Sequence, residues 1–154
     1  MFVYSLRVGE KIKEFTIPSI IIYFSLVKND NINYGYITQK LKLNPMKENK
    51  NEWVYEVIEN NCDNINIPSN KMLDILYNKM EIINDLCKKY RLEVHFTFVI
   101  SVKIGNSPLS KISKEFISFA SSINAQMGFD LYCYEEDGRF PIKEFDFDEY
   151  IKKD

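Results

Sequence analysis

Residues 92–103 have the sequence LEVHFTFVISVK, and their pattern is the clearest indication of the fold class. Apolar residues from Leu92 to Val102 occupy every second position, and the positions between them, from Glu93 to Lys103, are mostly polar. Side chains of a strand point alternately to the two faces of a sheet, so this period of two predicts a strand with one buried face. Such one-sided burial is typical of antiparallel sheets and argues against a wholly parallel sheet that is covered on both faces.

Shorter apolar runs predict three more strands, over residues 20–27, 53–58 and 129–134. Between them, apolar residues at steps of three and four predict helices. These are a short helix capped by Asn33 with Tyr34, Ile37 and Leu41 on one side, a long helix over 69–90, and a helix capped by Ser113. Residues 46–52 are expected to be a charged loop.

The resulting alternation of strands and helices predicts an α+β fold. Its sheet is expected to be four-stranded and mainly antiparallel, with helices on one face, in a ferredoxin-like arrangement with an inserted helix. The length of 154 residues fits a single domain. Residues 1–18 are predicted to be a strand or a hairpin. Residues 135–154 carry eight acidic and four basic side chains with scattered aromatics, and they form either a docked extension or a loose arm.

Composition excludes several classes of protein. The formal net charge is −2, which argues against a general nucleic-acid binder. The cysteines Cys62, Cys87 and Cys133 are widely spaced and odd in number, which is typical of reduced thiols in a cytoplasmic protein. We expect no signal peptide and no membrane span, because the longest apolar run, Ile20 to Phe24, is far below the roughly 20 residues that a span needs.

Motifs for catalysis or cofactor binding are absent from the sequence. It has one histidine, no C-x-x-C pair, no phosphate-binding loop and no G-x-S-x-G elbow. We therefore predict no metal, no cofactor and no enzymatic activity. His95 next to Glu93 on a polar strand face leaves a general base as an alternative.

Aromatic residues gather on the predicted sheet face opposite the core. The expected members are Tyr23, Tyr132, Tyr134 and either Trp53 or Tyr55, together with His95 and Asp130. Aromatic sheet faces stack bases in RNA-recognition modules. Here few arginines accompany them and Asp130 would repel phosphates. Tyrosine and tryptophan are also common in protein interfaces, where an acidic surface steers a basic partner. Asp130 itself is either a structural carboxylate or part of a pocket.

The order of several motifs is similar to a known bacterial family. Leu43-Asn44-Pro45 follows the short helix, Trp53 opens a strand, and Phe129-Asp130-Leu131-Tyr132 forms the last strand. Over residues 20–134 the chain resembles the family catalogued as domain of unknown function 4279. The loop Lys47-Glu48-Asn49-Lys50 departs from the family pattern. The resemblance implies a small cytoplasmic domain without a transferable activity, and small acidic domains of this kind include immunity proteins of bacterial toxins.

Three hypotheses of function follow from these observations. The first is a non-enzymatic protein-binding domain, for which a basic toxin is one candidate partner. The alternatives are a single-stranded nucleic-acid binder that uses the aromatic face, and an enzyme that uses His95 with Glu93 or Asp130. The oligomeric state is open. The candidate binding residues are Tyr23, Trp53, His95, Asp130, Tyr132 and Tyr134.

Overall fold

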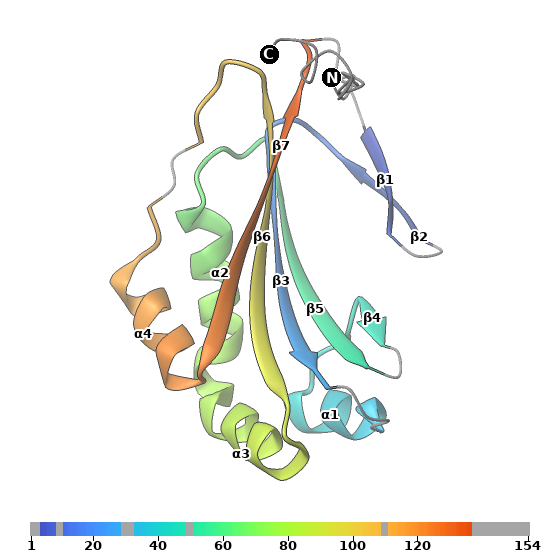
Figure 1. Cartoon of the computed structure of the whole chain (residues 1–154), viewed down its shortest axis with the longest axis vertical. Coiled ribbons are helices and arrows are strands. Elements are labelled where there is room, and N and C mark those ends of the chain that lie inside the picture. The colour runs from blue at the N-terminus through green and yellow to red at the C-terminus, as the bar shows by residue number, and fades with distance from the viewer. Residues whose placement is uncertain (1–3, 9–10, 29–32, 49–50, 109–110, 137–154) are drawn as a thin grey trace, which may run out of the picture.

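The computed structural model describes residues 4–8, 11–28, 33–48, 51–108 and 111–136. Within these ranges helices and strands are interspersed along the chain (Figure 1). The elements are β1 (Tyr4–Val8), β2 (Lys11–Phe15), β3 (Ser19–Val27), α1 (Tyr34–Leu41), β4 (Lys47–Glu48), β5 (Glu52–Asn60), α2 (Asn66–Leu76), the 3-10 turn η1 (Tyr77–Lys79), α3 (Met80–Tyr90), β6 (Glu93–Lys103), α4 (Lys114–Ser122) and β7 (Ala125–Tyr134).

The main sheet has the strand order β4-β5-β3-β6-β7. The central strand β3 pairs antiparallel with β5 on one side and with β6 on the other. β7 pairs with β6 in parallel, and α4 makes the crossover between these two strands. The pairing runs without interruption, with Ile22 opposite both Val57 and Phe98, so one set of alternate residues faces the helices on every strand.

The helices lie on one face of this sheet and enclose the core (Figure 1). Alternate residues of β3 and β6 supply its centre, and they meet buried residues of the helices. Phe116 of α4 packs its ring 4.9 Å from that of Phe96 and 5.8 Å from that of Phe98. The strand predicted over 92–103 therefore buries the expected apolar set.

The helices begin and end largely where local chemistry directs. Ser113 caps α4, because its hydroxyl accepts a hydrogen bond from the Phe116 amide. Asn33 occupies the N-cap position of α1, but its side chain makes no capping bond. The long helix predicted over 69–90 is instead two helices, α2 and α3, joined by the tight turn η1. α2 begins earlier than expected, at Asn66, and Pro68 is tolerated there because it lies in the first turn.

The N-terminal strands β1 and β2 form a separate antiparallel hairpin that projects away from the main sheet (Figure 1). Thr16 ties the end of this hairpin to β5. Its amide donates to Asn60 Oδ1 at 3.1 Å, and its hydroxyl accepts from the Asn61 amide at 3.0 Å. The peptide bond Ile17–Pro18 that follows is cis.

The predicted α+β class, the mainly antiparallel sheet and the helices on one face are confirmed. The short strand β4 adds a fifth member to the sheet, where a loop was expected. The ferredoxin-like detail is not confirmed. A ferredoxin-like fold has the order β-α-β-β-α-β, in which the second and third strands along the chain are joined directly. Here α2 and α3 separate the corresponding strands, β5 and β6, and β3 and β5 are antiparallel neighbours. Residues 137–154, most of the predicted acidic extension, lie outside the described residues.

Candidate functional site

The candidate site is the sheet face opposite the helices, which we call the open face. The pairing register assigns its members strand by strand. They are Ser19, Ile21, Tyr23, Ser25 and Val27 on β3, Glu52, Val54, Glu56, Ile58 and Asn60 on β5, Glu93, His95, Thr97, Val99, Ser101 and Lys103 on β6, and Gln126, Gly128, Asp130, Tyr132 and Tyr134 on β7.

Three tyrosines of the open face form a cluster on β3 and β7. Burial raises the pKa of Tyr23, and the nearby Tyr132 raises it further. Burial also raises the pKa of Tyr134, although a hydrogen bond with Ser101 opposes this, and Tyr132 again contributes. Tyr132 therefore lies close enough to both of its neighbours to influence their ionisation. Tyr134 is only 7% exposed, so it offers little surface to a partner.

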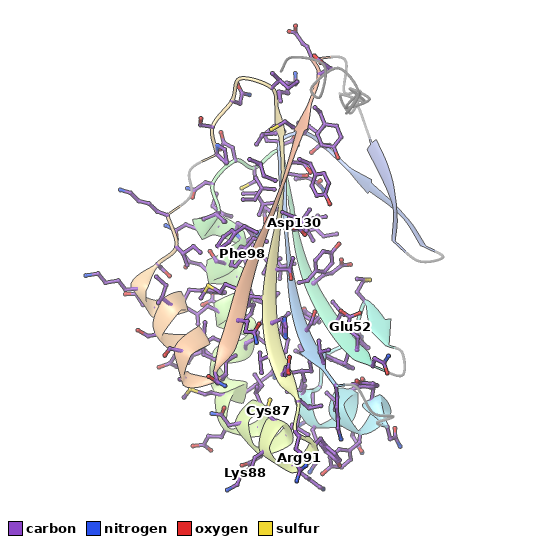
Figure 2. All side chains as sticks on the ribbon, in the orientation of Figure 1. Glu52, Cys87, Lys88, Arg91, Phe98 and Asp130 are labelled. Carbon is purple, nitrogen blue, oxygen red and sulfur yellow. The ribbon has the colours of Figure 1, made fainter. Side chains whose placement is uncertain are left out.

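Asp130 lies two residues before Tyr132 on the same strand, and its side chain belongs to the same face. Figure 2 shows Asp130 near the middle of β7. It stands opposite Val99, and its side chain is exposed to solvent. Within the described residues its carboxylate has no hydrogen bond or ion pair, so the interpretation as a structural carboxylate gains no support. An exposed charge beside a tyrosine is typical of the rim of a protein interface.

Further carboxylates give the open face an acidic character. Glu56 lies opposite Tyr23, and Glu52 and Glu93 flank Val27 at the other end of the sheet. Figure 2 shows Glu52 near that end of β5. On β3, β5, β6 and β7 the basic residues of this face are Lys103 and, when protonated, His95. Sequence reasoning missed Glu52, because it fell in the loop expected over 46–52. It also missed Glu56, because placing Trp53 or Tyr55 on this face put Glu56 on the other face.

His95 is paired with Glu93 and not with Asp130. Its Nε2 lies 3.3 Å from Glu93 Oε2, and its side chain is 34% exposed. His95 stands opposite Gln126, whereas Asp130 is four residues further along β7, which corresponds to roughly 13 Å. Of the two carboxylates proposed to act with His95, the structure thus brings only Glu93 within reach.

Trp53 does not belong to the open face, and its predicted place there is wrong. It lies opposite Leu26 on the helix-covered face and is completely buried. Its Nε1 donates a 2.8 Å hydrogen bond to Thr38 Oγ1 of α1, and its ring meets Phe24 edge-on at 6.2 Å. Tyr55 has the same parity and also points to the helices. Trp53 is therefore a core residue.

A second feature lies on the helical side, between α1 and α3. A cavity of about 290 Å³ is lined there by Tyr36, Lys40, Ile82, Asp85, Leu86 and Lys89. The Lys89 ammonium lies 5.1 Å from the ring centres of both Tyr36 and Tyr90. A hydrogen bond with the Tyr90 hydroxyl and the charges of both tyrosines raise the pKa of Lys89. Figure 2 shows Lys88 and Arg91 at the same end of α3, which is the end of the molecule away from the labelled Asp130.

No set of three or more histidine, cysteine, aspartate or glutamate side chains in the described ranges is arranged to hold a metal ion. None of the helices in those ranges is long and apolar enough to cross a membrane. The geometry therefore singles out the open face, with its tyrosine cluster and carboxylates, as the candidate site.

Comparisons with known proteins agree with the resemblance in sequence. A family model described as "Domain of unknown function (DUF4279)" matches residues 18–134. The matched region extends from Pro18, immediately before β3, to the last residue of β7, so it contains the main sheet and all the helices that the structure describes. No curated protein and no solved structure matches the chain. Because the match covers most of the sequence, this chain belongs to the DUF4279 family.

Proposed function

We propose that this chain is a non-enzymatic binding protein that docks a basic region of a protein partner on its open face. The observation that carries the proposal is the combination, on one sheet face, of the exposed Asp130, the partly exposed Tyr132 and Tyr23, and the carboxylate of Glu56. Tyrosines supply large contact area at low entropic cost, and surrounding carboxylates attract a positively charged surface.

The tyrosine cluster is suited to binding because it is held in place before a partner arrives. Tyr134 is buried and hydrogen-bonded to Ser101, and Tyr23 stands on the central strand of the sheet. Side chains on a rigid sheet lose little conformational entropy when they bind.

The acidic character of the face favours a protein over a nucleic acid. Phosphates would meet Asp130 and Glu56 beside the same tyrosines on which bases would have to stack. A toxin that degrades nucleic acid has a basic substrate-binding surface, and a face of this kind would cover it with electrostatically steered association. Neutralisation of such a toxin is the specific role that we propose, and a cytoplasmic location accords with it.

The test is affinity capture of the tagged protein from a lysate of its own host, with and without nuclease, followed by mass spectrometry. The wild type is compared with the double variant Asp130→Asn/Glu56→Gln, which removes two charges from the open face. The matched control is Asp74→Asn/Glu81→Gln, which removes two exposed charges from α2 and α3.

The expected result is a basic protein that survives nuclease, that the control double variant retains, and that the open-face variant binds at least tenfold more weakly at low salt. The difference should shrink as the salt concentration rises, because the lost interactions are electrostatic. A partner set that disappears with nuclease would instead support the nucleic-acid hypothesis. Equal capture by both double variants would place the interface elsewhere.

A further inference from the structure

β7 forms one edge of the main sheet, as the strand order of the described residues shows. β7 is the last strand of the sheet order, and in the part of the chain that the structure describes it pairs with the single strand β6. It is ten residues long, whereas the strand at the opposite edge, β4, has two residues. An edge strand presents a row of backbone N–H and C=O groups that can pair with another chain, and shortening the strand is one common protection. β4 has this protection and β7 does not.

Other protections are also missing from β7. The strand contains no lysine and no proline, its one charged residue is Asp130, and its register with β6 runs from Ala125 to Tyr134 without a bulge. Natural proteins usually place such features on a long edge to prevent association. An edge that lacks them is suited to a specific pairing.

Two large apolar side chains are exposed along this edge. Phe129 is 55% exposed and Leu131 is 58% exposed, although both have the parity of the helix-covered face. The cause is a mismatch in length. α4 has nine residues and is about 14 Å long, whereas the ten residues of β7 extend for about 33 Å, so α4 covers only part of the strand (Figure 1). Phe129 is held rigidly, because its ring stacks on that of Phe98 at 4.9 Å and 12°.

We propose that β7 pairs antiparallel with β7 of a second copy of this chain, about a two-fold axis that passes through Phe129. A closed two-fold dimer uses the same surface on both copies, which an antiparallel strand pair satisfies. Residues that stand directly opposite each other in a strand pair point to the same face of the sheet. If the helix-covered faces of both copies lie on the same side, every odd-numbered residue of β7 must therefore stand opposite an odd-numbered residue of the second copy. This requires a two-fold axis at which one residue stands opposite its own copy. The residues nearest the middle of β7 are Phe129 and Asp130.

The charges decide between these two registers. An axis at Asp130 would set this carboxylate directly opposite its own copy, and like charges in that position are destabilising. An axis at Phe129 sets the two phenyl rings opposite each other and places Leu131 opposite Met127 of the second copy. Asp130 then faces Gly128 of the second copy. Gly128 has open space where a side chain would begin, since a Cβ built there meets nothing within 4 Å, so the carboxylate is accommodated without a clash.

This dimer uses the edge of β7 and the helix-side residues, so it is independent of the proposed function of the open face. Its first test is sedimentation equilibrium of the full chain over a range of concentrations. The wild type should approach twice the chain mass of 18.2 kDa. Leu131→Lys should remain at 18.2 kDa, because it places a charge in the pairing surface. Ile67→Lys, a matched change at an apolar residue of α2 that is 45% exposed, should associate like the wild type.

A cysteine cross-link tests the register itself and does not depend on a destabilising change. Under mild oxidation Phe129→Cys should form a disulfide-linked dimer, because position 129 meets its own copy across the axis at a distance that a disulfide can bridge. Leu131→Cys should not, since it faces Met127 of the second copy, and the wild type measures any background from the native thiols. A wild type that stays monomeric at all concentrations would overturn the proposal. A dimer that survives Leu131→Lys, or that cross-links equally through positions 129 and 131, would overturn it too.

Discussion

The indole of Trp53 on β5 donates a 2.8 Å hydrogen bond to the hydroxyl of Thr38 on α1. Trp53 is completely buried, so this bond satisfies an indole N–H that has no access to water. It also joins the helix to the sheet at the point where the chain returns from α1 toward β5. The pair therefore stabilises both the core and the position of α1.

Removing the acceptor of this bond should destabilise the fold. Thr38→Val keeps the shape of the side chain but leaves the Trp53 N–H unpaired, and we expect a loss of about 1–3 kcal/mol in the free energy of unfolding. Urea denaturation followed by the fluorescence of Trp53, the one tryptophan of the chain, measures this directly. Thr38→Ser retains the hydroxyl and is the control. Equal losses in the two variants would show that the methyl group matters and the hydrogen bond does not.

The cap of α4 should contribute measurably to stability. Ser113 Oγ accepts from the Phe116 amide at 3.2 Å and lies 3.3 Å from Asn70 Oδ1 of α2. Ser113→Ala removes the cap and should cost about 1 kcal/mol. Ser118→Ala, at an exposed position within α4, should be neutral or slightly stabilising, because alanine favours helix. Chemical denaturation of the two variants side by side makes the comparison, and an unchanged midpoint for Ser113→Ala would contradict the assignment.

Cys87 should react slowly with alkylating reagents while the protein is folded. Burial raises the pKa of its thiol from 9.0 to about 11. Only the thiolate is nucleophilic, so near pH 8 the reactive fraction falls from about one in ten to about one in a thousand. We expect alkylation of Cys87 by iodoacetamide to be roughly a hundredfold slower in the native protein than in urea, as peptide mass spectrometry would show. Similar rates in the two states would contradict the burial of this thiol.

Stability should decline on the alkaline side of neutrality. Burial raises the pKa of Cys87 and of Tyr23 above their ordinary values of 9.0 and 10.0, so the fold favours their neutral forms. Below those ordinary values both states of the protein are neutral at these groups and the stabilisation is fully present. As the pH rises through 9 to 10 the unfolded chain ionises first, and the free energy of unfolding falls.

Urea midpoints measured from pH 7 to 11 test this decline. Tyr23→Phe has no phenol to ionise and should show a shallower fall between pH 10 and 11 than the wild type. Parallel curves for the two proteins would exclude a contribution of Tyr23.

The strongest predictions from sequence rested on the strict alternation of apolar and polar residues. In residues 92–103 every second side chain is apolar, so both the strand and its buried face could be predicted. β5 lacks this clarity, because Trp53, Val54, Tyr55, Val57 and Ile58 offer apolar groups to both faces. Which face is covered then depends on α1, whose Thr38 meets Trp53, and no local pattern reports that contact.

Local sequence patterns also could not predict the order of the strands in the sheet or the division of the long helix into two. The stripe Met72, Leu76, Ile83 and Leu86 is buried as its spacing predicts, yet the turn at Tyr77–Lys79 divides the helix. A three-residue 3-10 turn keeps nearly the same spacing of apolar residues as an α-helix, so periodicity does not reveal it. On the candidate site, parity predicted that Asp130, Tyr132 and Tyr134 share a face, but which of them solvent reaches depends on packing across strands.

The central position of β3 has a consequence for synthesis on the ribosome. β3 is complete at Val27, and β5 closes one of its edges by Asn60, but its other neighbour begins only at Glu93. Until that strand has left the exit tunnel, the nascent chain carries the β-branched run Ile20–Ile22 with an open edge, a form that invites aggregation. α2 and α3 are made during this interval and cover the apolar side of the unfinished sheet. Emergence of β6, which ends at Lys103, from the exit tunnel is thus the step at which β3 gains its second neighbour and the risk of aggregation through that edge ends.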